Sequence, residues 1–162
     1  MTTVTNARPN ILWIVGEDCP PRFGCYGGPL ARTPHLDSLA GRGTLFEYAY
    51  SSAPVCASSR FSLITGIPSE SHAPANEMRA VAPLPAWMPA YPEILRGVGY
   101  YCTNCSKTDY NAAFDEHTVW NECSPSAHWR DRPEGMPSSR CSTPSRGPES
   151  RRRCPPCASR PP

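Results

Sequence analysis

The sequence predicts an α/β fold whose sheet is at least partly parallel, and three observations lead to this expectation. The apolar run "ILWIV" at 11–15 has the length and the β-branched content of a fully buried strand. Helix and strand signals then alternate in the order β-α-β-α-loop-α-β, which is typical of sheets with parallel strands. A chain of 162 residues is long enough for one domain with an ordinary hydrophobic core.

The segment after the first strand carries the signals of a short helix and a second strand. Thr33 is expected to be the N-cap and Pro34 the first helical residue, because proline is favoured at that position. Gly41 or Gly43 is expected to end this helix. The following stretch "TLFEYAY", residues 44–50, is interpreted as a strand.

The next part of the chain predicts two more helices and another strand. Residues 58–65 have helical periodicity, and Gly66 is placed to end the helix. Proline-broken loops are expected over 68–89, and the stretch "YPEILRGVG" reads as a short helix. The stretch "YYCTNCSKTDY" is expected to be a strand that runs into a loop.

The composition divides the chain into residues 1–8, 9–136 and 137–162. Residues 1–8 are expected to be flexible, and 9–136 to form part of one catalytic domain. Residues 137–162 contain no Leu, Ile, Val, Met or aromatic residue, so we expect a disordered tail in which "CPPC" is incidental. One interpretation of the abrupt change is a shifted reading frame after Met136, and the alternative is a natural disordered tail.

Charge and cysteine content narrow the classes of partner and compartment. The net charge of +2 does not indicate binding to nucleic acid, and no stretch has the length and hydropathy of a membrane span. The nine cysteines are odd in number, and no apolar leader precedes Ile11. We therefore expect reduced thiols and a cytoplasmic location.

The stretch "PVCASSRFSLITG" places Cys56 at the beginning of a predicted helix and Arg60 one turn later. Helix N-terminal amides favour anions and lower the pKa of a thiol. Three interpretations remain open: a buried free cysteine with a surface arginine, a thiolate phosphatase, or a cysteine that is covalently modified before use. The phosphatase loop needs about five residues between cysteine and arginine, whereas this chain has three.

Four motifs together resemble the N-terminal half of a sulfatase of the alkaline-phosphatase superfamily. They read "NILWIVGEDC", "GCYGGPLARTPHLDSLAGRGTLFEYAY", "APVCASSRFSLITG" and "GYYCTNCSKTDYN". The resemblance covers about 9–136 and is greatest to members close to heparan N-sulfatase, which open with Glu-Asp rather than Asp-Asp. It implies the N-terminal part of an alkaline-phosphatase-like mixed sheet with flanking helices.

The resemblance also implies a catalytic constellation for hydrolysis of sulfuric esters. It makes Cys56 the residue that a formylglycine-generating enzyme oxidises to formylglycine, whose hydrate attacks sulfur, and Arg60 the residue that holds it. It assigns Glu17, Asp18 and the modified Cys56 to a calcium ion and Lys107 to the sulfate. Independently of the resemblance, two carboxylates after a buried strand lie where α/β sheets place ligands, although a solvated turn is the alternative.

Three positions depart from the pattern of the family or match only some of its members. His72 falls where some members carry a substrate-binding histidine, with a solvated loop residue as the alternative. Asp109 stands where many sulfatases have histidine, and its default role is a structural hydrogen bond. Ser58 replaces the proline of the Cys-x-Pro-x-Arg motif, so conversion of Cys56 is expected to be impaired.

The resemblance implies an enzyme by family, with a sulfated small molecule or sugar as substrate. Family members are much longer, and their later cation ligands and a further sulfate-binding lysine follow the matched region. The 162-residue chain is therefore expected to be an inactive fragment. Alternatives are a non-catalytic truncated product and a phosphonate or phosphate monoester hydrolase of the same superfamily.

Overall fold

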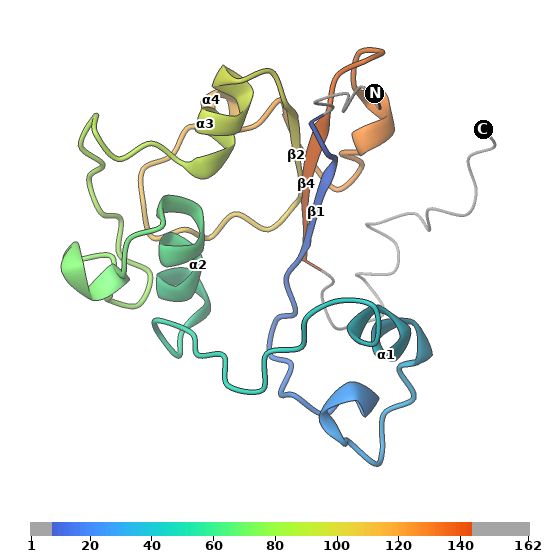
Figure 1. Ribbon diagram of the computed structural model, residues 1–162. Helices are drawn as coiled ribbons and strands as arrows, with labels where there is room; N and C mark the ends of the chain where they lie inside the picture. Colours follow the sequence, from blue (N-terminus) through green and yellow to red (C-terminus); the bar gives the residue numbers. More distant parts are fainter. Residues whose placement is uncertain (1–7, 144–162) are drawn as a thin grey trace, which may run out of the picture.

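A computed structural model describes residues 8–143, which contain one four-stranded parallel sheet with helices on one face (Figure 1). The strand order is β1-β4-β2-β3, and all three pairings are parallel. The strands are β1 (Ile11–Ile14), β2 (Tyr101–Cys105), β3 (Glu122–Cys123) and β4 (Ser138–Ser142). The predicted α/β class is confirmed, and the strands described here are parallel throughout.

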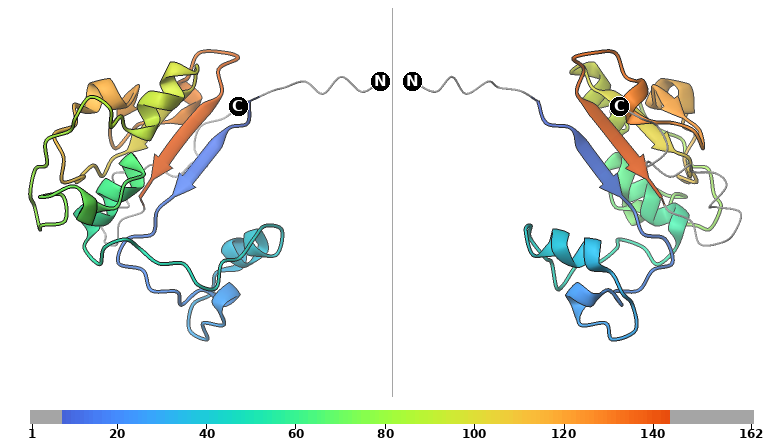
Figure 2. Two further views of the ribbon diagram at one scale, coloured as in Figure 1. Left: turned by 60° about the vertical axis from the view of Figure 1, so that its left-hand side comes forward. Right: turned by 90° about the vertical axis from the view of Figure 1, so that its right-hand side faces the viewer.

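The helices fall into two separate groups. Three of them, α2, α3 and α4, cover one face of the sheet, whereas α1 and the 3₁₀ turn η1 lie apart, beyond the carboxyl end of β1 (Figures 1 and 2). The helices are α1 (Pro34–Ala40), α2 (Cys56–Thr65), α3 (Tyr91–Gly97) and α4 (Glu116–Val119). The 3₁₀ turns are η1 (Gly24–Tyr26), η2 (Ser69–Ser71) and η3 (Trp129–Asp131).

The hydrophobic core lies between the sheet and the helices that cover it. One cluster of buried side chains includes Ile64, Tyr100, Val119 and Trp120. A second cluster forms around Phe61 on α2 with three residues from the loops that follow, Ala75, Ala82 and Met88. Among residues 8–143, no helix is both long and apolar enough to cross a bilayer.

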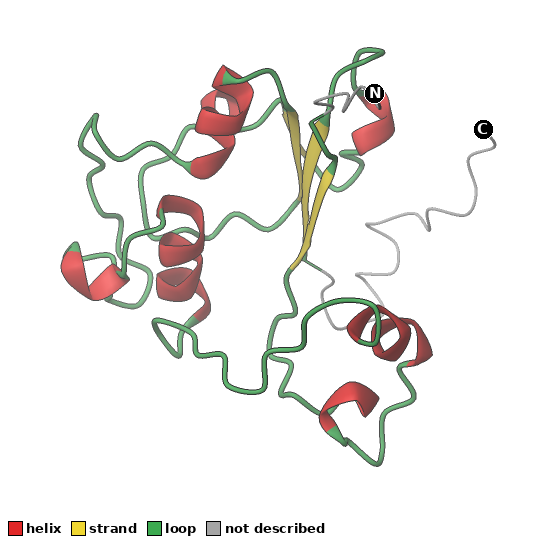
Figure 3. Ribbon diagram, viewed as in Figure 1, coloured by secondary structure: helices red, strands yellow, loops and turns green. Residues whose placement is uncertain are grey.

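Most predicted helices and strands are confirmed, with small differences in their bounds. The helix α1 begins at Pro34 after Thr33, as expected. The helix α2 begins two residues before the predicted start, and it ends at Gly66, whose φ of 73° is the left-handed conformation that favours glycine. The segment between α2 and α3 is mostly irregular loop (Figure 3).

Two expectations about the first half of the chain are wrong. The strand β1 is not fully buried, because it lies at an edge of the sheet, where Leu12 and Ile14 are 63% and 55% exposed. Residues 44–50 form no strand, although the sequence predicts one there. In the described part of the chain, no strand lies beside this stretch to accept its backbone hydrogen bonds.

The predicted disordered tail begins too early, because Ser138–Ser142 forms the strand β4 inside the sheet. Its residues pair with β1 on one side and with β2 on the other, so both sets of backbone groups are hydrogen-bonded. This pairing orders a segment that has little apolar side-chain area of its own. Residues 1–7 and 144–162, including the "CPPC" motif, lie outside the described residues.

Candidate functional site

Cys56 is the first residue of α2, and its side chain is exposed. The preceding Val55 is the N-cap and is extended, without a side chain that accepts a hydrogen bond from the helix. The backbone N–H of Ser59 donates to the carbonyl of Val55 at 2.9 Å. This leaves the N–H groups of the first turn free to face an anion, as expected at a helix N-terminus.

Cys56 lines an open cleft of about 390 Å³ together with Glu17 and Asp18. The two carboxylates follow β1, at the carboxyl end of that strand. The opposite wall comes from α2 and from the loop 51–55. The structure thus brings together on one cleft the three residues that the sequence assigns to a common site.

A chain of polar contacts links Cys56 to Glu17 through the loop after β2. The thiol of Cys56 donates a hydrogen bond to Asp109 Oδ2 at 3.4 Å. The Nζ of Lys107 lies 3.8 Å from the same oxygen and forms an ion pair with Glu17 Oε1. Lys107 is therefore held between two carboxylates, and Asp109 is in direct contact with the candidate nucleophile.

Arg60 lies one helical turn after Cys56 and is 4% exposed. Its guanidinium donates to the carbonyl oxygen of Lys107 at 3.4 Å and to Thr143 Oγ1 at 2.9 Å. The ion pairs of Lys107 with Glu17 and with Asp109 do not include Arg60. Because a buried cation is costly without a counter-charge, Arg60 favours an anion in the adjacent cleft.

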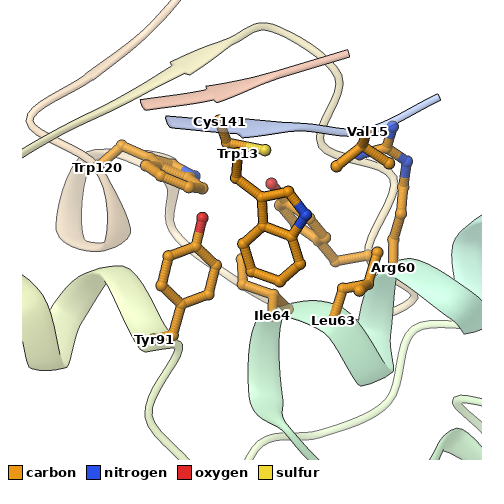
Figure 4. Close-up of a pocket in the computed structure, with 9 residues that line it drawn as sticks. Trp13, Val15, Arg60, Leu63, Ile64, Tyr91, Trp120 and Cys141 are labelled. Atoms are coloured by element: carbon orange, nitrogen blue, oxygen red, sulfur yellow. The ribbon is translucent and has the colours of Figure 1, made fainter. Parts of the chain in front are cut away.

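Arg60 also lines a second, largely aromatic pocket between the sheet and the helices α2 and α3 (Figure 4). Trp13 from β1 packs on Tyr91 from α3, with ring centroids 5.4 Å apart, and Tyr91 meets Trp120 edge-on at 5.9 Å. Burial raises the pKa of the Tyr91 hydroxyl far above its ordinary value. A cavity of only about 20 Å³ remains, so the pocket is packing for the site and leaves no room for a substrate.

His72 does not reach the cleft. Its ring stacks on Phe61, with centroids 5.7 Å apart and planes 7° from parallel. Its Nε2 is 2.6 Å from the carbonyl oxygen of Pro83. The structure therefore gives His72 a place in the packing below α2, and His72 is not among the residues that line the cleft with Cys56.

Sequence reasoning underestimated or missed two of these residues. Asp109 carries a usable signal, because it follows Lys107 by two positions in the same loop. Thr143, which binds Arg60, lies in the range expected to be disordered and gave no signal. Within residues 8–143, no three His, Cys, Asp or Glu side chains come together as a metal site, so Glu17 and Asp18 do not form a complete cation site.

Comparisons with known proteins identify the family and the fold. The family model described as Sulfatase matches residues 9–140. An ulvan-active sulfatase from Formosa agariphila is 41% identical over 141 residues, which cover 80% of this chain and 24% of that protein. Human N-sulphoglucosamine sulphohydrolase is 44% identical over 63 residues, covering 38% of this chain and 12% of that protein.

A solved structure shares the fold at low sequence identity. It is a complex with the substrate D-glucosamine-2-N,6-O-disulfate and is 16% identical, with a TM-score of 0.64. The match covers 84% of this chain and 34% of that chain. The chain spans about a quarter of the length of the ulvan-active relative.

Proposed function

Because this chain belongs to the sulfatase family, we propose that its described residues carry the nucleophile side of a site that hydrolyses sulfuric esters. The observation that supports this most is the unbroken series of contacts from Cys56 through Asp109 and Lys107 to Glu17. These contacts connect the proposed nucleophile position to a cation and to two carboxylates, and Cys56 and Glu17 at the two ends of the series line one open cleft. The buried Arg60 adds a second positive charge to the same place.

We propose that Cys56 is converted to formylglycine by a formylglycine-generating enzyme. The exposed position at the mouth of α2 fits access by such an enzyme, and Cys56 is free of any disulfide. When formylglycine is present, its hydrated aldehyde supplies the oxygen that attacks sulfur. At this position Asp109 Oδ2 can accept a proton from a hydroxyl, as it accepts the thiol hydrogen bond of Cys56.

The two cations of the site have distinct roles in this proposal. Lys107 has a partly exposed Nζ that contacts Glu17, a residue of the cleft, and it can contact a sulfate oxygen while it remains paired with Glu17. Arg60 is held by Lys107 and Thr143, so it acts as a fixed charge beside residue 56. Fixed positive charge in a partly desolvated cleft stabilises negative charge that develops on the transferred sulfate.

For a divalent cation, we propose only which residues would bind it. Glu17 and Asp18 supply hard oxygen atoms, which suit calcium. The described residues offer no complete set of ligands, so we assign no step to the cation. We propose for the same reason that the 162-residue chain binds sulfated compounds without hydrolysing them.

A sulfated sugar is the substrate class that the relatives support. One relative is named for its activity on ulvan, and the solved neighbour holds a disulfated glucosamine. The cleft of about 390 Å³ is open and lined by both polar and apolar groups, as a sugar ring requires. We propose that the sulfate group binds beside Cys56 and that the sugar ring lies farther from Cys56 than the sulfate does.

The conversion of Cys56 can be tested by mass spectrometry. Trypsin releases residues 43–60, a peptide in which Cys56 is the only cysteine. From cells that contain the converting enzyme, we expect a small fraction of aldehyde at this residue and a larger one after Ser58→Pro. The substitution removes no helical hydrogen bond, because the first bond of α2 is donated by Ser59.

The Cys56→Ala variant is the control and must yield no aldehyde. Absence of aldehyde from both the native chain and Ser58→Pro would contradict the proposed modification. Hydrolysis of an aryl sulfate by the unconverted chain in the presence of calcium would contradict the mechanism.

A further inference from the structure

We propose that a second cleft beside Cys56 binds a second sulfate group of the sugar, with Arg79 as its cationic contact. This inference rests on the proposed function, because it assigns the first sulfate to the cleft of Cys56. It adds a specificity determinant: a sugar that carries two sulfates is preferred over one that carries a single sulfate.

The second cleft measures about 280 Å³, and it is related to the first through Asp109, which lines the second cleft and contacts the Cys56 thiol that lines the first. Its walls come from the loop 108–112, from residues 79–81, and from Phe114 and Glu116. The carboxylate of Asp109 touches the thiol of Cys56, and Asp109 also lines the second cleft. A ligand whose sulfate lies beside Cys56 can therefore extend past Asp109 into the space beside Arg79.

Asn111 holds the two clefts in a fixed relation. Its Nδ2 lies 3.0 Å from the carbonyl oxygen of Ala75 and 2.6 Å from that of Glu77, both shortly before Arg79. The same nitrogen lies 3.4 Å from Ser58 Oγ, two residues after Cys56. One buried amide thus ties the loop of Arg79 to the helix of Cys56.

Residues with an unusual backbone conformation line the same two clefts. Four residues other than glycine have positive φ within residues 8–143: Asp18 (49°), Arg79 (56°), Asp109 (35°) and Asn111 (49°). Asp18 lines the cleft of Cys56, and the other three line the second cleft. Such conformations are disfavoured for residues with a side chain, and they persist where the surroundings fix them, often at binding sites.

Arg79 offers a positive charge that the described residues do not neutralise. Its side chain is exposed, and the ion pairs of Lys107 with Glu17 and Asp109 do not include it. Of the two acids on the walls, Asp109 already contacts Lys107 and Cys56, whereas Glu116 lies in α4. The planar guanidinium can bind two oxygens of a sulfate at once, which a carboxamide does not reproduce.

The test compares sugars that differ in one sulfate. Binding of glucosamine-2-N,6-O-disulfate, glucosamine-6-O-sulfate and glucosamine-2-N-sulfate to the 162-residue chain is measured by calorimetry at low ionic strength, where charge contacts are least screened. We expect the disulfate to bind about tenfold more tightly than either monosulfate, the effect of one charge-assisted contact. Arg79→Gln should abolish this preference, and Arg79→Lys should retain part of it.

Arg42→Gln is the matched control, because Arg42 lies beyond α1 and lines neither cleft. It should leave all three affinities unchanged. Equal binding of disulfate and monosulfates, or a preference that survives Arg79→Gln, overturns the inference alone. Failure of all three sugars to bind overturns both the inference and the proposed function.

Discussion

The helix that carries Cys56 and the helix that follows β1 are supported by opposite kinds of interaction. Five residues of α2 are buried, and they pack against loops and α3 in the body of the molecule. Neither α1 nor η1 contains a buried residue. We call residues 19–50, which include α1 and η1, the arm, and we call the sheet with α2, α3 and α4 the body.

Polar contacts hold the arm together. The carboxylate of Asp37 accepts hydrogen bonds from the N–H of Cys25 at 2.8 Å and from Thr33 Oγ1 at 2.9 Å. Thr33 is therefore engaged with its own helix and with Gly24, whose N–H it accepts, and it makes no N-cap bond. A Cβ on Gly24 would lie 2.5 Å from Asp37, so this close approach requires glycine.

The residues of the candidate site come from parts of the molecule that are stabilised in these two different ways. Cys56, Arg60 and Lys107 belong to the body, where buried side chains fix their positions. Glu17 and Asp18 lie between β1 and the arm. In the described residues, the ion pair of Glu17 with Lys107 is the charged link between these two parts of the site.

The largest effect expected from the comparison is on stability. Phe61 is fully buried in α2, whereas Phe46 in the arm is 67% exposed. Phe61→Ala should lower the free energy of unfolding by about 3–5 kcal/mol, because it removes a core ring and leaves a cavity. Phe46→Ala should change it by less than about 0.5 kcal/mol. Urea unfolding followed by circular dichroism measures both, and similar losses would contradict the division.

A second pair of variants tests the polar support within the body. Asn111 is 6% exposed and its side chain bonds the backbone carbonyls of Ala75 and Glu77, whereas Asn76, which lies between these two residues, is exposed. Asn111→Ala should cost about 1–3 kcal/mol, since buried acceptors lose their donor and alanine tolerates positive φ less well. Asn76→Ala should change stability little in the same urea titration. An equal, small change for both variants would mean that Asn111 does not fix this loop.

Much of the fold could be predicted because local signals and tertiary packing agree. Proline at the start of α1 and glycine at the end of α2 are chemical requirements of those positions, and both were read correctly. The segment 44–50 shows the opposite case. Its aromatic residues suit a strand, but a strand also needs a neighbouring strand, and nothing local in the sequence indicates whether one is present.

The strand β4 shows a further limit of composition. Its residues "SSRCS" have no apolar periodicity, yet Ser139 and Cys141 pair with Cys102 and Asn104 of β2 through shared register. Order here comes from backbone hydrogen bonds to both neighbours, a property of position in the sheet. Composition alone therefore assigned an ordered segment to a tail.

The site residues that could be predicted are those that directly follow a strand or begin a helix. Glu17 and Asp18 at the end of β1 and Cys56 at the start of α2 line one cleft, as those positions predict. The contacts of Asp109 and Asn111 depend on how one loop folds back on α2, which sequence spacing does not encode. His72 illustrates the reverse error, since a motif position does not determine where a loop side chain packs.

The smallest expected effect is on the pH dependence of the stability of the body, to which its buried thiols contribute. Burial raises the pKa of Cys102 from 9.0 to about 11, with a smaller opposing effect of Arg96. The folded state therefore binds this proton more tightly than the unfolded state, and the resulting stability is present below pH 9 and lost between pH 9 and about 11. The slope should be on the order of 1 kcal/mol per pH unit.

The variant Cys102→Ala tests this expectation. Its loss of stability does not depend on pH, so its urea midpoint should decline less steeply above pH 9 than that of the native chain. The comparison is made below pH 10, where the buried tyrosines contribute little. Parallel declines in the two proteins would show that this thiol titrates in the folded body as it does in the unfolded chain.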